Sequence, residues 1–415
     1  MQHVSWLSSS GLGPVLVPGM YPSAIAQRLR PMASMGGSLA ARVPTSRHDA
    51  ARMPSRTGDR APARLGGMPA SAPILGFHAS HEQFAPGDLL ELAARATAGG
   101  FDAVMCSDHF HPWSDAQGES GHAWSWLGAS MTRNQVTHGV VTSPAGRYHP
   151  AVIAQAAATL ASMFPGRFWL AVGSGEALNE SITGEPWPPK AVRDSRLRES
   201  ADVLRALWRG EEVDHNGTVT VRHAKLYSRP EAPPPMFVAA LTPETARWGA
   251  QWADGLITTS MAPDKQRAVA DAFREGGGEG KPMVLQVKLS WHPDEGEALR
   301  GAMAQWRTNV LPPEVSENLA SPDAFERRAN DVDEETLREA VRVSSDLGQQ
   351  ADWLRDDLCM GFDALYLHNV NRHQAGFIDA FAREVLPAVR DARRPLLTRE
   401  MVVAMGGLEP PTPAL

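Results

Sequence analysis

Residues 107–113 form the most concentrated group of reactive side chains in the chain, Ser107-Asp-His-Phe-His-Pro-Trp113. An Asp beside a His can orient the imidazole or bias its protonation state, as proton transfer near neutral pH requires. The alternative is that Asp108 and His109 only satisfy each other and a backbone group. We favour a catalytic role for the pair, because it closes an apolar run that is expected to be a strand.

The same segment contains a second motif, the H-x-H pair of His109 and His111. In a metal-dependent barrel hydrolase such a pair would bind a divalent ion, with further His or carboxylate ligands from later strand ends. The later ends at 239–242, Ala-Ala-Leu-Thr, and 258–260, Thr-Thr-Ser, supply none. A metal-dependent hydrolase is therefore the second hypothesis, and it rests on this pair alone.

Residues 173–180, Gly-Ser-Gly-Glu-Ala-Leu-Asn-Glu, are the second candidate segment. Two glycines let the backbone approach a planar or phosphorylated ligand, because no Cβ intervenes. Glu176 would be a proton donor that faces the same cavity as His109. Alternatively, the segment is a tight strand-to-helix turn with Glu176 near a helix N-terminus.

A third segment, Thr242-Pro243-Glu244-Thr245, has the composition of a helix start. Its free amides could bind a phosphate, although capping alone is the commoner situation. Four tryptophans also fall in connections between expected elements, and exposed indoles there would form an apolar wall for a flat ring. The four are Trp113, Trp124, Trp126 and Trp187. For Trp124 and Trp126 we favour ordinary packing.

These segments lie between eight short apolar runs that alternate with amphipathic helical stretches. The runs are Ile74–Ala79, Phe101–Ser107, Val136–Thr142, Phe168–Val172, Met236–Ala240, Gly255–Thr259, Met283–Leu289 and Asp363–His368. Eight βα units predict an α/β fold, a (β/α)8 TIM barrel over residues 72–393. Two insertions are expected in it: a hairpin within 210–232 and a polar segment at 307–345. A doubly wound open sheet is the alternative, but no glycine fingerprint follows the first strand. The active site of a barrel lies at the C-terminal strand ends, where the polar segments above occur.

Composition bounds the remaining possibilities. The 415-residue chain carries a net charge of -7, which argues against nucleic acid as a partner, and no apolar run approaches the roughly 20 residues of a membrane span. Its two cysteines, Cys106 and Cys359, suggest free thiols in a reducing cytoplasm. Residues 1–71, rich in Arg and poor in acids, are expected to be a disordered extension, and 394–415 a disordered tail. The amino-acid sequence is compatible with a homodimer.

Four segments of the chain resemble the luciferase-like flavin- or F420-dependent oxidoreductases, among them the F420-dependent glucose-6-phosphate dehydrogenases. They begin at Gly76 (Gly-Phe-His-Ala-Ser-His-Glu-Gln-Phe), Ser107, Arg147 (Arg-Tyr-His-Pro-Ala-Val-Ile-Ala-Gln-Ala) and Gly173. The resemblance extends from about residue 73 to 390. It implies an oxidoreductase of the monooxygenase or dehydrogenase type that transfers hydride between a small organic molecule and a flavin-type cofactor.

The resemblance also implies roles for individual residues. His109 would be the base or polariser at the substrate carbon, Asp108 would position it, Trp113 would stabilise the reacting complex, and Glu176 would supply a proton to the cofactor ring. The expected cofactor-binding residues are Asp108, Val140, Val141, Ser143, Gly173, Ser174, Gly175, Glu176, Leu241 and Thr242, with a non-prolyl cis peptide at Val140-Val141. The expected substrate-binding residues are Thr259, Ser260 and Arg327.

Two departures from the family pattern affect the choice of cofactor and substrate. The family's Gly-Gly that receives the cofactor phosphate is here Leu241-Thr242, and the Lys that grips a sugar phosphate is replaced at Ala262. Glucose 6-phosphate is thus doubtful as the substrate. We prefer FMN as the cofactor, with F420 second, because a helix start at Thr242 suits a compact terminal phosphate. A non-catalytic flavin-binding barrel is the third hypothesis.

Overall fold

A computed structural model describes residues 73–391, and the expectations for 1–71 and 394–415 lie outside this range. Eight parallel strands in it form a closed barrel, in the order β1-β2-β3-β4-β7-β8-β9-β11 with β11 pairing back to β1. Their bounds are β1 Ile74–Ala79, β2 Ala103–Ser107, β3 Thr137–Thr142, β4 Phe168–Val172, β7 Met236–Ala239, β8 Gly255–Thr259, β9 Met283–Ser290 and β11 Ala364–Asn369. The barrel prediction is confirmed, and each predicted strand overlaps an observed one.

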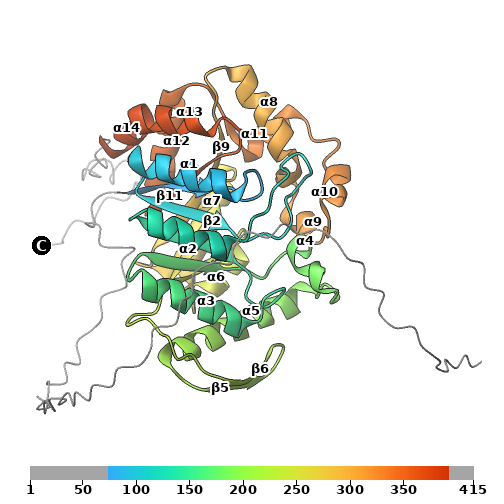
Figure 1. The fold of residues 1–415 in the computed structure, drawn as a ribbon. Helices are drawn as coiled ribbons and strands as arrows, with labels where there is room; N and C mark the ends of the chain where they lie inside the picture. The colour runs from blue at the N-terminus through green and yellow to red at the C-terminus, as the bar shows by residue number, and fades with distance from the viewer. Residues whose placement is uncertain (1–72, 392–415) are drawn as a thin grey trace, which may run out of the picture. The chain divides into compact units, whose positions relative to one another are not determined.

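Helices surround this barrel, as Figure 1 shows for α1, α2 and α3 beside their strands. The longer ones are α1 Pro86–Ala98, α2 Ala123–Arg133, α3 Pro150–Met163, α5 Lys190–Arg209, α7 Pro263–Phe273, α8 Glu295–Trp306 and α12 Leu347–Cys359. The shorter ones are α4 Ala177–Glu180, α6 Pro243–Gly249, α9 Pro313–Ser316, α10 Pro322–Arg328, α11 Glu334–Ala340, α13 Gln374–Ala380 and α14 Leu386–Asp391. Among the described residues, no helix combines the length and apolarity needed to cross a bilayer.

The two predicted insertions have their own structure. Strands β5 Val213–Asn216 and β6 Thr220–Ala224 pair antiparallel, which confirms the hairpin within 210–232. The segment 307–345 forms α9, α10 and α11 and ends in the short strand β10 Arg342–Val343, which pairs with β9.

Two apolar clusters stabilise the barrel. A larger one fills the space between strands and helices, and a smaller one fills the barrel interior, with Trp169 stacked on Phe237 and against Tyr366. Gly139 makes this interior packing feasible, because a Cβ there would lie 2.0 Å from the Trp169 ring. The bulky interior closes the barrel below the polar layer at its C-terminal end.

Candidate active site

A buried ion pair between Glu82 and His109 lies at the C-terminal end of the barrel. Nδ1 of His109 is 2.9 Å from Oε1 of Glu82, and their side chains are 18% and 3% exposed. The second carboxylate oxygen of Glu82 accepts a hydrogen bond from Oγ of Ser80 at 2.9 Å. Because Glu82 follows β1 and His109 follows β2, neighbouring parallel strands bring the two side chains together.

Burial and charge set the protonation of this pair and of Glu176. Burial lowers the pKa of His109, but the Glu82 carboxylate opposes it, and the net pKa is raised. Burial would raise the pKa of Glu82, but the contact with His109 outweighs it and the pKa is lowered. Burial raises the pKa of Glu176 to about 7, although His109 opposes the shift, and its Oε2 is buried with no hydrogen-bond partner in the described chain. The site thus combines an imidazole whose pKa is raised by a buried carboxylate and a carboxyl group that titrates near neutrality.

Trp113 forms the wall beside His109. Their rings meet edge to face with centroids 5.3 Å apart, and the Trp113 ring also meets Phe325 of α10 edge to face, with centroids 5.0 Å apart. The polar insertion at 307–345 therefore supports the site, because its helix α10 fixes the orientation of this tryptophan. A rigid aromatic side chain next to a titrating imidazole suits the binding of a small organic substrate.

Asp108 does not position His109, and this prediction is wrong. Its carboxylate forms an ion pair with Arg147 at 2.9 Å and accepts hydrogen bonds from Nε1 of Trp124 at 3.0 Å and Oγ1 of Thr142 at 2.8 Å. Successive side chains of an extended chain point to opposite sides, so Asp108 faces helix α2 while His109 faces the barrel mouth. With its carboxylate buried and engaged in this way, Asp108 has a structural role.

The H-x-H pair does not form a metal site either. Nδ1 of His111 lies 2.9 Å from the carbonyl oxygen of Leu178, so this imidazole is bonded away from His109. Within residues 73–391, the potential ligands that do converge are the exposed Glu212, Asp214 and His223 of the β5–β6 hairpin. At the barrel mouth, the described residues therefore offer no convergent set of metal ligands that would support the hydrolase hypothesis.

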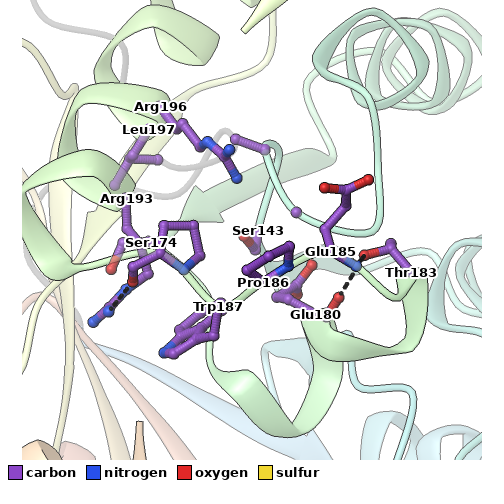
Figure 2. A pocket seen from close by; sticks show the side chains of 14 residues that line it. Ser143, Ser174, Glu180, Thr183, Glu185, Pro186, Trp187, Arg193, Arg196 and Leu197 are labelled. Atoms are coloured by element: carbon purple, nitrogen blue, oxygen red, sulfur yellow. Dashed lines mark hydrogen bonds between the residues drawn. The ribbon is translucent and has the colours of Figure 1, made fainter. Parts of the chain in front are cut away.

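Three of the predicted cofactor residues line one cavity, shown in Figure 2. Ser143, Gly173 and Ser174 border about 550 Å³ of empty space, counting its open mouth, between the strand ends and α5. Trp187 and Pro186 add an apolar wall. Gly175, in the neighbouring turn, has φ +81°, and a Cβ there would lie 2.9 Å from Oγ of Ser143, which agrees with the tight strand-to-helix turn given as the alternative for this segment.

These features fit a flavin-type cofactor. A Cβ added to Gly173 would have only the side chain of Ala239 within 4 Å, so the backbone at Gly173 borders open space that a ligand could occupy. Oε2 of Glu176 is buried without a hydrogen-bond partner among the described residues. A buried polar atom of this kind is expected to have a partner, and a ring nitrogen or carbonyl of a bound cofactor would supply one. Ser143, Gly173 to Gly175 and Glu176 would hold such a ring.

The remaining predicted residues are more scattered. Val140 packs in the cluster between barrel and helices, whereas Val141 contacts the barrel interior. The cis peptide expected between them is absent, since the described residues contain no cis peptide and both valines follow the regular register with β4. Thr242 caps α6 by accepting from the Thr245 amide at 3.3 Å, which confirms the helix start, and Leu241 is exposed.

Of the expected substrate residues, Thr259 ends β8 and Ser260 is buried, its Oγ accepting from the Lys288 amide at 2.9 Å. Arg327 lies on the exposed face of α10 and pairs with Asp323 one turn away. The structure therefore gives Arg327 a surface ion pair and places it outside the residues gathered around His109.

Two residues at the barrel mouth escaped the sequence analysis, Glu82 and Lys288. Glu82 stands three residues after β1, in a segment noted only for its resemblance. Lys288 shares the face of β9 that places Val284 and Gln286 inside the barrel, and its partner in register is His368. Burial lowers the pKa of the Lys288 ammonium to about 8, helped by Arg342.

Known proteins resemble this chain in sequence and fold. Residues 61–358 match the family model described as luciferase-like monooxygenase. An F420-dependent glucose-6-phosphate dehydrogenase of Beutenbergia cavernae is 37% identical over 331 residues, 77% of this chain and 98% of the relative. The enzyme of the same name from Intrasporangium calvum is 38% identical over 333 residues, 76% of this chain and 98% of the relative. Among solved structures, an F420-dependent secondary alcohol dehydrogenase in complex with an F420-acetone adduct matches with TM-score 0.73 and 32% identity, covering 77% of this chain and all of that one.

Proposed function

The chain belongs to the luciferase-like monooxygenase family and is a flavin-type oxidoreductase, and on this premise we propose that it is an F420-dependent dehydrogenase of a small hydroxylated substrate. The observation that carries the proposal is the buried Glu82–His109 pair beside the carboxyl group of Glu176. Together they provide a base for a substrate proton and an acid near the cofactor ring.

F420 is preferred over FMN, which reverses the preference drawn from Leu241-Thr242. The three similar proteins named above carry F420 in their names, and none carries FMN. The argument for FMN rested on a phosphate at the start of α6, and the hydroxyl of Thr242 is engaged there as the helix cap. This supports treating Thr242 as a structural residue.

The proton steps follow from the geometry. When bound, the cofactor would accept or donate hydride at its ring. Because Nδ1 of His109 faces Glu82, Nε2 is the atom left to take a proton from a substrate hydroxyl. The Glu82 carboxylate then stabilises the imidazolium formed. Glu176, whose pKa is raised to about 7, is protonated in part of the molecules near neutral pH and would supply that proton to the cofactor ring.

The substrate class follows from what the site lacks. Position 262, where the family places a phosphate-gripping Lys, is an exposed Ala at the start of α7. Beside His109 the wall is the aromatic ring of Trp113. These features support an uncharged secondary alcohol over glucose 6-phosphate.

Turnover of F420 with a panel of substrates tests the proposal. Purified enzyme is mixed with oxidised F420 and either a series of secondary alcohols or glucose 6-phosphate, and loss of deazaflavin absorbance is followed. We expect reduction with at least one alcohol and a much lower kcat/KM with glucose 6-phosphate. Turnover that requires FMN in place of F420 would contradict the cofactor assignment.

The cellular compartment and the oligomeric state also remain predictions. Cys106 and Cys359 are both free thiols, which supports a reducing compartment such as the cytoplasm. A homodimer stays a prediction, for which size-exclusion chromatography with light scattering is the direct measurement.

A further inference from the structure

Helix α5 presents to the cavity of Figure 2 one cation that has no carboxylate partner among the described residues. The helix carries six basic side chains, and five pair with carboxylates: Lys190, Arg193, Arg198, Arg205 and Arg209. Arg196 has no ion pair within residues 73–391, and its Nε is buried without a hydrogen-bond partner there. An Nε–H group that is removed from water without a partner is costly, which points to a ligand that supplies an acceptor.

The surroundings of Arg196 suit an anion. Figure 2 shows its side chain extending from α5 across the cavity toward Ser143 and Pro186. The hydroxyl groups of Ser143 and Ser174 are further donors on the lining.

Two carboxylates also line the cavity. Glu180 pairs with Arg147 at 2.7 Å, a guanidinium that it shares with Asp108, and Glu185 is exposed to water. The neighbouring Arg193 is compensated by Glu317 at 2.6 Å. Of the two basic side chains that line the cavity, Arg193 and Arg196, only Arg196 therefore lacks a carboxylate partner within residues 73–391.

This cavity belongs to the same surface as the reacting groups. Gly173 and Ser174 line it, and Glu176 follows in the same strand-to-helix loop. A cofactor held at Glu176 would have this cavity next to it. The start of α6, by contrast, offers a capped helix of only seven residues.

We propose that this cavity binds the phosphoryl group of the cofactor, with Arg196 as its cationic contact. The proposal rests on the proposed function, since it assumes a flavin-type cofactor. A guanidinium presents donors in a planar fork that matches two phosphate oxygens. The chain would thus hold the phosphate from α5. The exchange of the family's Gly-Gly for Leu241-Thr242 would then reduce the affinity for the cofactor only slightly.

Binding titrations with three ligands test the proposal. They are F420, the 5′-phosphate of its deazaflavin riboside, and the riboside without phosphate, each followed by fluorescence with wild type and Arg196→Gln. We expect Arg196→Gln to weaken the two phosphorylated ligands by about 10- to 100-fold and to leave riboside binding unchanged. Arg198→Gln is the matched control, on the same helix but exposed and paired with Asp202, and should leave all three ligands unchanged.

Each outcome is decisive. A wild-type affinity of Arg196→Gln for both phosphorylated ligands overturns the proposal, and a loss confined to F420 assigns Arg196 to the carboxylates of the tail instead. If Arg196→Gln loses the riboside as well, Arg196→Lys, which keeps the charge, must recover part of the phosphate-dependent affinity. If wild type binds no deazaflavin, the F420 assignment fails, and the same comparison with FMN and riboflavin decides the role of Arg196.

Discussion

His109 takes its carboxylate partner from the loop that follows the neighbouring strand: Nδ1 of His109 lies 2.9 Å from Oε1 of Glu82, whereas the adjacent Asp108 bonds elsewhere. Glu82 is almost fully buried, so its charge acts on the imidazole through a medium that screens it poorly. The protonation of His109 therefore depends on a residue 27 positions earlier in the chain.

Replacing Glu82 should move the pH dependence of the reaction. In Glu82→Gln the carboxylate that raises the pKa of His109 is gone, so the pKa of the imidazole falls. A base must be unprotonated to act, and the acidic limb of kcat/KM should shift to lower pH. The maximal rate should fall about 10- to 100-fold, because a weaker base accepts the proton less readily. A pH–rate profile of both enzymes is the measurement.

Asp108→Asn separates the two carboxylates. It breaks the ion pair with Arg147, so we expect a lower melting temperature but an acidic limb at the wild-type pH. If the limb moved in Asp108→Asn and stayed in Glu82→Gln, our assignment of the partner would be wrong.

Removing the imidazole should abolish chemistry and spare cofactor binding. We expect kcat of His109→Ala to fall ~10²–10⁴-fold, as for loss of a general base, with F420 affinity close to that of wild type. Because the variant leaves Glu82 buried without its partner, the double variant His109→Ala/Glu82→Gln serves as the fold control. Near wild-type kcat in either variant would reduce the pair to a structural contact.

Glu176 should control the basic limb. Its pKa of about 7 means that the protonated acid is lost as pH rises through that value, so kcat should decline above it. Glu176→Gln cannot ionise and should remove this decline while lowering kcat by ~10²–10⁴-fold. Stopped-flow reduction of F420 across pH 5–9 (roughly the span of both limbs) would show it. A basic limb that persists in Glu176→Gln belongs to another group.

The barrel could be predicted from the sequence because its signals are local. Each strand is a short apolar run between helical stretches, and this alternation can be recognised in the sequence without knowing what packs against each element. The cap at Thr242 and the turn at Gly175 were predictable for the same reason: each depends on one residue's own backbone or hydroxyl.

The contacts between side chains within the site could not be predicted from such local signals. Asp108 and His109 are neighbours in sequence, yet an extended backbone turns them to opposite sides. Glu82, Arg196 and Lys288 carry no motif of their own, and only the closure of the barrel and the packing of α5 bring them to the site. Long-range register decides such contacts, and spacing along one chain does not encode it.

Lys288 should destabilise the native protein at neutral pH. Its pKa is lowered to about 8 by burial, against 10.5 for an ordinary lysine, so the folded state binds this proton less tightly than the unfolded state. Stability therefore rises as pH increases from about 8 to 10.5, and below that window the full cost of a buried charge is present. Lys288→Met removes the charge and keeps the length of the side chain. At pH 7 it should raise the free energy of unfolding by up to ~3 kcal/mol, the equivalent of the pKa difference.

The pH dependence of that gain distinguishes a charge effect from better packing. Denaturant unfolding of wild type and Lys288→Met at several pH values between 7 and 10.5 should show a gap that narrows as pH rises. The control is Lys265→Met, which changes an exposed lysine of α7 and should give a constant difference. A Lys288→Met variant less stable than wild type at pH 7 would mean that the ammonium has a partner in solution that compensates its burial. A gap that does not change with pH would assign the gain to packing of the methionine inside the barrel.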